Sequence, residues 1–364
     1  MNLVSDTKID TVAIIGTGLM GGSLGMAILE RGLARTVRGY DRDRASLESA
    51  LKRRAITEIS FGAEQAAAGA DLVVIATPVG VIGPIFEGLR TALKDGAYAT
   101  DLGSTKARIV TGVGRSAPFV GGHPMTGSQR SGIAAARPDL YTGCLWILTP
   151  VDDTSRECAK KLTQLLTDLH VRWVMMDPQT HDANLAKVSH LPQLISSALA
   201  AYVEEGSKSS IPGGPALADM TRIAASDPEM WVDILRDNPG QVLSAVDGYR
   251  RLLDELRNFI AGEDWDELSQ FLENARAVTA SIETKPGVDP LDLFEVRVRV
   301  VDRPGFIAEV TAAVTAAGLN IEDLRIEHGA GAGRGILYLS LKGAAAAEGA
   351  VAVIRTSGFK AHLG

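Results

Sequence analysis

The sequence predicts an α/β fold in three parts: a doubly wound parallel sheet, an all-helical domain and a small α+β domain of ferredoxin-like order. From residue 10 to about 150, short β-branched runs alternate with amphipathic stretches, which is typical of a parallel sheet with helices on both faces. Apolar residues then recur every three or four positions to about residue 283, as in packed helices. A β-α-β-β-α-β pattern completes the chain. The expected parts are residues 1–152, residues 153–285, a linker at 286–292 and residues 293–364.

Length and composition restrict the class of protein. The chain has 364 residues, 46% of them hydrophobic, and a net charge of −7. No apolar run reaches the ~18 residues that span a bilayer, so we expect no membrane partner. The first ten residues lack the apolar core of a signal peptide, and two cysteines cannot form a disulfide framework, so we expect a cytoplasmic location. The negative charge argues against nucleic acid as a partner.

The first predicted strand, TVAII, leads directly into a glycine-rich turn. Gly16, Gly18 and Gly21 are spaced as G-x-G-x-x-G and open a helix. In this motif the glycines permit a tight turn, close approach of a pyrophosphate and close packing of helix on strand. Asp41 ends the second strand, where a carboxylate can accept hydrogen bonds from both ribose hydroxyls and repel a 2′-phosphate. The sequence therefore predicts a Rossmann-type domain that binds NAD, although Arg42 and Arg44 leave NADP open.

Two polar loops follow later strands of this domain. One reads DLGSTK from Asp101, and the other reads GGHPMTGSQ at residues 121–129. We expect the substrate at these loops, because the carboxyl ends of the strands also hold the cofactor. His123, between two glycines and a proline, suits a base that takes a proton from an alcohol near neutral pH. Ser104 is a candidate to orient that ring and, not exclusively, to cap the following helix.

The helical domain offers further candidate residues. His181 and His190 are nine residues apart, not the four that place two ligands on one helix face, so we expect no metal. One or both are expected to be packed or to line a pocket. Arg222 is either a carboxylate clamp or the partner of Asp219. The long apolar helices in residues 180–280 predict a homodimer.

The last part of the chain follows a linker with two prolines and a glycine, TKPGVDP. A strand in FEVRVRVVD leads through a turn at Arg303-Pro304-Gly305 into a helix. A strand in NIEDLRIEH, a glycine-rich hairpin, the strand ILYLSLKG, an alanine-rich helix and a short final strand complete the expected ferredoxin-like unit.

Motifs along nearly the whole chain resemble the prephenate and arogenate dehydrogenases of tyrosine biosynthesis. In order they are GTGLMGGSLG, ATP at residues 76–78, DLGSTK, GGHPMTGS, SHLP and DMTRIAASDPEMW. The C-terminal DRPGFIAEVTAAVTAAGLNIEDLRI resembles an ACT domain, a module that commonly senses amino acids. The resemblance implies an NAD-dependent dehydrogenase that converts prephenate to 4-hydroxyphenylpyruvate by oxidative decarboxylation. His123 would take the hydroxyl proton, with Ser104 beside it, and Arg222 would bind a substrate carboxylate.

The expected site residues form three sets. The cofactor set comprises Gly16, Gly18, Leu19, Met20, Gly21, Asp41, Arg42, Thr77 and Pro78. The substrate-binding set comprises Arg222, Ser128, Gln129, His190, Gln193 and Trp231. The effector set, implied by the ACT resemblance, comprises Arg303, Pro304, Gly305, Asn320 and Ile321, and predicts feedback inhibition by tyrosine.

Two positions depart from the common pattern, and they bear on the substrate. Gln129 stands where many members have an acidic residue, and Gln193 ends a motif that often reads SHLPH. An acid would favour the ammonium of arogenate, so glutamine at residue 129 favours prephenate. Arogenate (cyclohexadienyl) dehydrogenase is the alternative. Two further alternatives are a β-hydroxyacid dehydrogenase that uses Lys187 and a regulator that binds NAD and an amino acid without turnover.

Overall fold

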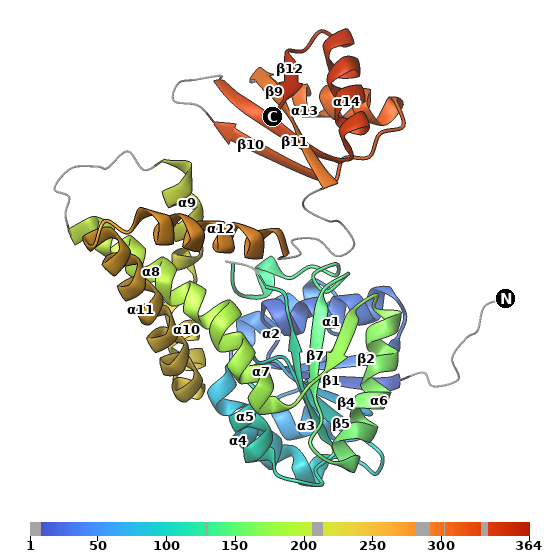
Figure 1. The fold of residues 1–364 in the computed structure, drawn as a ribbon. Coiled ribbons are helices and arrows are strands. Elements are labelled where there is room, and N and C mark those ends of the chain that lie inside the picture. The colour runs from blue at the N-terminus through green and yellow to red at the C-terminus, as the bar shows by residue number, and fades with distance from the viewer. Residues whose placement is uncertain (1–8, 128–129, 206–213, 282–291, 302, 329–333) are drawn as a thin grey trace. The chain divides into compact units, whose positions relative to one another are not determined.

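The computed structural model describes residues 9–127, 130–205, 214–281, 292–301, 303–328 and 334–364 (Figure 1). The chain divides into two compact units, Met1–Leu252 and Leu253–Gly364. Within the described ranges, no helix is both long enough and apolar enough to cross a membrane.

The first unit is built on one eight-stranded sheet in the order β3-β2-β1-β4-β5-β6-β7-β8. The strands from β3 to β6 pair in parallel, β7 runs antiparallel to β6, and β8 is parallel to β7. The predicted doubly wound sheet is therefore confirmed. Its strands are β1 (Ile9–Ile15), β2 (Ala34–Tyr40), β3 (Glu58–Ile59), β4 (Leu72–Ile75), β5 (Tyr98–Asp101), β6 (Phe119–Pro124), β7 (Leu145–Thr149) and β8 (Arg172–Met175).

Helices cover both faces of the sheet because successive residues of the strands enter two different cores. Val12 and Ile14 of β1 pack with one set of helices, whereas Ala13 and Ile15 pack with the other. The first set is α1 (Leu19–Glu30), α2 (Arg44–Lys52) and α6 (Asp153–Asp168), and the second is α3 (Ala63–Ala67), α4 (Val79–Leu89) and α5 (Ala107–Val113). Both faces are apolar, which explains the continuous apolar runs in the sequence.

The sheet extends past the boundary expected at residue 152. Helix α6 returns the chain to the sheet, and β8 adds an edge strand that ends at Met175. Three of the four residues of β8 are exposed. Its sequence, RWVM, does not alternate between apolar and polar residues, the pattern from which a half-buried strand is recognised. The first domain is therefore longer than expected by one helix and one strand.

The turn after β1 lies where the strand order reverses, since β2 and β4 flank β1 on opposite sides. Gly16 has a φ of +98°, and a Cβ there would lie 2.4 Å from the carbonyl oxygen of Ala76. A Cβ on Gly21 would lie 2.0 Å from the carbonyl oxygen of Gly16, whereas a Cβ on Gly18 would meet no atom within 4 Å. Gly16 and Gly21 thus serve packing, and Gly18 leaves space in front of the N-terminus of α1.

The helical part of the first unit begins with a long, irregular helix. Helix α7 (Pro178–Leu185) continues through a π-helical turn (Ala186–His190) into α8 (Leu191–Glu205). Pro192 has no N–H to donate, so a regular α-helical ladder cannot continue through it, and Leu191 N–H bonds to Ala186 five residues back. The remaining elements are α9 (Pro215–Thr221), the 3₁₀ turn η4 (Arg222–Ala225), α10 (Pro228–Asp237) and α11 (Pro239–Ala261), whose C-terminal end belongs to the second unit.

The second unit also contains α12 (Trp265–Ser281) and a small four-stranded antiparallel sheet in the order β10-β11-β9-β12. Valines and leucines of β9 and β11 pack against two helices to form its core. The elements follow one another as β-α-β-β-α-β: β9 (Leu293–Val301), α13 (Phe306–Ala316), β10 (Asp323–His328), β11 (Arg334–Lys342), α14 (Ala344–Thr356) and β12 (Ala361–Leu363).

The glycine turn predicts different results for two similar substitutions. Gly21→Ala forces a methyl group against backbone and should lower the free energy of unfolding by about 1–3 kcal/mol. Gly18→Ala should change stability by less than about 0.5 kcal/mol, yet weaken NADH binding by about tenfold or more because the methyl group fills the space a pyrophosphate needs. Thermal denaturation without ligand and NADH fluorescence titration measure the two effects. Equal stability of both variants would contradict this account of the turn.

Candidate active site

Asp41 is held rigidly at the end of β2. Its Oδ2 accepts a hydrogen bond from Thr17 N–H at 2.8 Å, and its Oδ1 accepts one from Asp43 N–H at 3.0 Å. Since Thr17 follows Gly16, these bonds tie the carboxylate to the glycine turn. A hollow of about 290 Å³ lies beside it, lined by Tyr40, Asp41, Arg42, Arg44, Leu47, Glu48, Ile59, Ser60 and Phe61. A fixed acid beside a hollow of this size fits the ribose and adenine of a dinucleotide.

The other expected cofactor residues lie at the same edge of the sheet. Leu19 and Met20 begin α1 and are half-buried, and the carbonyl of Met20 accepts the Tyr141 hydroxyl at 2.7 Å. Thr77 and Pro78 follow β4, and the buried Thr77 hydroxyl has no hydrogen-bond partner among the described residues. Arg44 Nε lies 3.3 Å from Glu48 Oε1, so Arg44 is in an ion pair. Arg42, next to Asp41, forms no ion pair with the described residues.

His123 lies near the carboxyl end of β6 and is only 8% exposed. The small glycines beside it suggest an imidazole with little side-chain cover, but the ring is buried. A Cβ on Gly121 would lie 2.4 Å from the Thr149 hydroxyl, and one on Gly122 would lie 2.7 Å from the Asp101 carbonyl oxygen. The two glycines allow close packing of β6 on its neighbours, and they bury the imidazole.

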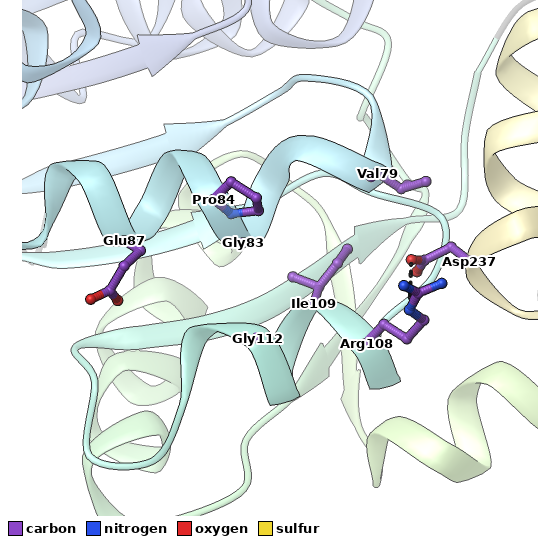
Figure 2. Close-up of a pocket in the computed structure, with 9 residues that line it drawn as sticks. Val79, Gly83, Pro84, Glu87, Arg108, Ile109, Gly112 and Asp237 are labelled. Carbon is purple, nitrogen blue, oxygen red and sulfur yellow. Dashed lines mark ion pairs between the residues drawn. The ribbon is translucent and has the colours of Figure 1, made fainter.

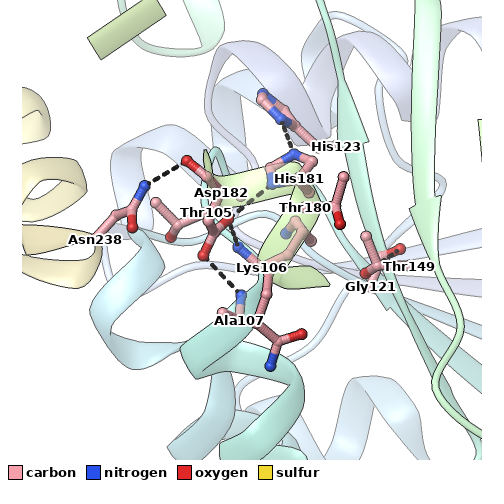
Figure 3. A network of polar contacts seen from close by, with 12 residues as sticks. Thr105, Lys106, Ala107, Gly121, His123, Thr149, Thr180, His181, Asp182 and Asn238 are labelled. Carbon is pink, nitrogen blue, oxygen red and sulfur yellow. Dashed lines mark hydrogen bonds and ion pairs between the residues drawn. The ribbon is translucent and has the colours of Figure 1, made fainter. Parts of the chain in front are cut away.

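A chain of buried hydrogen bonds runs from His123 into the helical part of the unit (Figure 3). His123 Nδ1 lies 2.8 Å from His181 Nε2, and His181 Nδ1 lies 2.7 Å from Asp182 Oδ1. The sequence left His181 as a packed or pocket-lining residue and gave no role to Asp182. The local sequence, PQTHDANL, is a short and largely polar helix in which the His-Asp pair does not stand out.

Asp182 also accounts for the start of α5. Its carboxylate accepts hydrogen bonds from Lys106 N–H at 2.8 Å and Ala107 N–H at 2.9 Å. The expectation that Ser104 caps this helix is wrong, because helix α5 begins at Ala107 and its N-terminal N–H groups bind Asp182 instead. The ring nitrogen Nδ1 of His123 is likewise occupied by His181 and not by Ser104. Ser104 lies half-buried in the loop, and its catalytic role stays a prediction.

A fully buried ion pair lies beneath His123. Lys106 Nζ binds Asp101 Oδ2, and neither side chain is exposed. The Asp101 carboxylate also accepts N–H groups of Gly103 and Gly122, so its charge is well compensated. Burial lowers the pKa of His123 well below its usual range, and the nearby Lys106 ammonium lowers it further. The ring is therefore neutral near pH 7 and able to accept a proton.

His190 and Trp231 form a second cluster. Their ring centroids are 6.1 Å apart, and His190 is 1% exposed. Neither nitrogen of His190 nor Nε1 of Trp231 has a hydrogen-bond partner among the described residues. Burial lowers the pKa of His190 to about 4. Buried polar atoms without partners are uncommon and mark a place where a polar ligand group or a water can bind.

The remaining candidates are distributed around these two clusters. Gln193 is 5% exposed on α8, one turn beyond His190. Arg222 begins η4, which packs on α8. Lys187, the base expected for a β-hydroxyacid dehydrogenase, is exposed. Ser128 and Gln129 lie outside the described residues.

A second hollow lies between α4 and α5 (Figure 2). It measures about 370 Å³ and is formed mainly by α4 and α5, with the Arg108–Asp237 ion pair at one end. None of the expected site residues lines it.

Comparison with known proteins identifies the family. The profile described as prephenate dehydrogenase, nucleotide-binding domain, matches residues 24–175, and the profile described as prephenate dehydrogenase, dimerization domain, matches residues 177–274. Prephenate dehydrogenase of Bacillus subtilis is 32% identical over 329 residues, which cover 87% of this chain and 88% of that protein. Both matched profiles end before the small C-terminal sheet.

Solved structures agree with this assignment. Prephenate dehydrogenase of Aquifex aeolicus, in complex with hydroxyphenyl propionate and NAD+, is similar with a TM-score of 0.71 and 31% identity over 76% of this chain and all of that one. Synechocystis arogenate dehydrogenase has a TM-score of 0.66 and 27% identity over 74% of this chain and 98% of that one. The predictions of an oxidoreductase and of NAD as its cofactor are confirmed. The chain belongs to the prephenate dehydrogenase family.

Proposed function

We propose that this chain catalyses the NAD-dependent oxidative decarboxylation of prephenate to 4-hydroxyphenylpyruvate, a step of tyrosine biosynthesis. The observation that supports it best is the state of His123. The ring is buried and neutral, its Nδ1 is engaged by His181, and its Nε2 makes no hydrogen bond among the described residues. It lies at the sheet edge that carries the glycine turn and Asp41, so a base and a hydride acceptor can meet the same carbinol group.

The chemistry requires little more than this base. NAD accepts the hydride from the ring carbinol carbon. His123 Nε2 accepts the proton of the hydroxyl group on that carbon. The bond to the ring carboxylate then breaks, CO₂ leaves, and the bonding electrons make the ring aromatic. The phenolate oxygen takes the proton back from His123, so the base is regenerated. Because aromatisation drives the loss of CO₂, the protein needs only to position and polarise the hydroxyl.

The helical part supplies the substrate-binding residues of the proposal. Arg222 can bind a substrate carboxylate through its planar guanidinium group. The unpartnered ring nitrogens of His190 and Trp231 offer polar atoms to the substrate. Gln193 is a neutral amide that provides no charge for the ammonium of arogenate, and this favours the keto acid prephenate. Ser128 and Gln129 complete the proposed set.

We further propose a cytoplasmic homodimer. The match to a dimerization domain over residues 177–274 supports the dimer. Large apolar side chains are exposed on these helices, among them Tyr202 (74%), Leu243 (63%) and Leu272 (58%). Such side chains on a helical domain are typical of a subunit interface. Cys144 and Cys158 are both free, in keeping with a reducing compartment.

The small sheet is proposed to be an ACT-type domain that binds tyrosine. Its β-α-β-β-α-β order supports this. Arg303 makes two hydrogen bonds of 2.6 Å to the carboxylate of Glu309, which lies in the first turn of α13. Gly305, between them in the sequence, has a φ of +85°. Asn320 donates to Glu322 at 2.6 Å, and Ile321 packs on the domain core. Tyrosine carries a carboxylate that can bind Arg303 in place of Glu309. It also carries an ammonium that can bind Glu309 in place of Arg303.

Loss of the base tests the proposed function directly. His123→Asn should lower kcat for prephenate by about 10²- to 10⁴-fold, the usual contribution of a general base, and change KM little. NADH formation is measured with prephenate and with arogenate, and prephenate should give the higher kcat/KM. His170→Asn, at an exposed residue with a φ of +58°, is the matched control. A wild-type chain that binds NADH but turns over neither substrate would be a regulator instead.

The lowered pKa of His123 predicts the pH dependence. The base must be neutral, so kcat/KM, which reports the free enzyme, should stay level around pH 7 and fall only below pH 6.5, the usual value for histidine. Lys106→Met removes a nearby positive charge that opposes protonation, so the acid limb should move to higher pH. A wild-type limb centred at or above pH 6.5 would show that the ring is not held neutral.

Tyrosine sensitivity tests the C-terminal domain. Arg303→Gln should raise the tyrosine concentration for half-inhibition by about tenfold and leave kcat without tyrosine unchanged. Arg299→Gln, at an exposed residue of β9, is the control and should keep full sensitivity. If a chain that lacks residues 288–364 is still inhibited by tyrosine, the inhibitor binds at the active site.

A further inference from the structure

We propose that His181 and Asp182 are positioning residues that fix which nitrogen of His123 carries the proton. In this arrangement the proton is on Nδ1, and Nε2 keeps the lone pair that accepts the substrate proton. The inference rests on the proposed function for the role of His123 as base. The state of the ring can nevertheless be measured without turnover.

The argument begins at Asp182, whose side chain is 3% exposed. A backbone N–H can only donate, so the bonds from Lys106 to Oδ1 and from Ala107 to Oδ2 show that both carboxylate oxygens are acceptors. The third partner, His181 Nδ1, lies 2.7 Å from Oδ1. A carboxylate that accepts on both oxygens at the positive end of a helix remains ionised. His181 Nδ1 must therefore carry a hydrogen and donate it.

In the proposed arrangement His181 is a neutral imidazole, which has one donor nitrogen and one acceptor nitrogen. With its hydrogen on Nδ1, the Nε2 of His181 can only accept. Its partner is His123 Nδ1 at 2.8 Å, so that nitrogen must donate. The remaining nitrogen of His123, Nε2, is then an acceptor. The opposite order would place a hydrogen on Nε2 of His123 and remove the base.

Burial of both rings keeps the hydrogens on the nitrogens assigned above. His181 is 0% exposed and its ring crosses that of His123 at 65°, with centroids 5.1 Å apart. No bulk water competes for these nitrogens, so each ring nitrogen depends on its protein partner. When His123 takes the substrate proton, the same bonds stabilise the imidazolium, since Asp182 lies at the end of the series.

The test should act on His181, because Asp182 also caps α5 and its loss would disturb the helix. His181→Leu removes the acceptor at similar volume. His181→Gln returns a carbonyl oxygen that can accept from His123 Nδ1. The matched control is Thr105→Val, which removes a buried 2.6 Å hydrogen bond to Asp237 from the neighbouring loop without contacting His123.

Nitrogen NMR of the full-length chain, labelled with ¹⁵N-histidine, distinguishes protonated from unprotonated ring nitrogens. The chain has six histidines, and the signals of His123 are those absent from His123→Asn. The wild type should show Nδ1 protonated and Nε2 unprotonated. His181→Leu should move hydrogen onto Nε2 and lower kcat by about a hundredfold or more, with KM changed by less than about threefold. His181→Gln should recover at least about tenfold of the lost kcat.

Thr105→Val should lower thermal stability and leave the His123 signals unchanged. A protonated Nε2 in the wild type overturns the proposal, and this spectrum does not require any variant to fold. An unchanged His123 pattern in His181→Leu, or a kcat loss no larger than that of Thr105→Val, also overturns it. Full activity of His123→Asn would instead refute the proposed function, because the nitrogen spectra do not depend on turnover.

Discussion

The buried carboxylate of Asp182 joins α7 to the start of α5. It accepts the N-terminal N–H groups of α5, which follows the polar loop after β5, and it binds His181 on α7. Asp182 lies 76 residues after Lys106 and 75 residues after Ala107 in the sequence. A buried carboxylate needs such donors to remain charged, and a buried helix start needs such an acceptor. The carboxylate and the start of α5 therefore satisfy each other, and the position of His123 depends on both.

Two glycines of β6 also help to fix the surroundings of His123, because they allow the strand to pack closely on its neighbours. Gly121 and Gly122 let β6 approach Thr149 and the backbone of Asp101 within distances that no side chain allows. The Asp101 carboxylate then reaches the N–H of Gly122 and the ammonium of Lys106. Electrostatic control of His123 therefore arises from residues that carry no reacting group. The ring remains neutral because it is buried and because positive charge lies close to it.

The sequence predicted the features that are encoded locally. The glycine spacing and Asp41 fall within some twenty-five residues of one another, and each has a role that depends on a single turn or strand end. His123 was proposed as the base because a histidine between glycines and a proline suits proton transfer, although it lies in β6 and not in a loop. Its buried partners could not be identified, since no short spacing relates β6 to α7. The same reason explains why Ser104 was considered as a cap of α5, whereas the acceptor is Asp182, which is distant in sequence.

The π-helical turn at Ala186–His190 has a consequence for how this region tolerates change in length. It inserts one extra residue between the helix that carries His181 and the helix that carries Gln193. Each residue of an α-helix turns the chain by about 100°. Deletion of one residue here would therefore turn every later side chain of α8 by about 100° relative to α7. The angle between His181, which supports the candidate base, and Gln193, a candidate substrate-binding residue, thus depends on the number of residues between them. A substitution leaves that number unchanged.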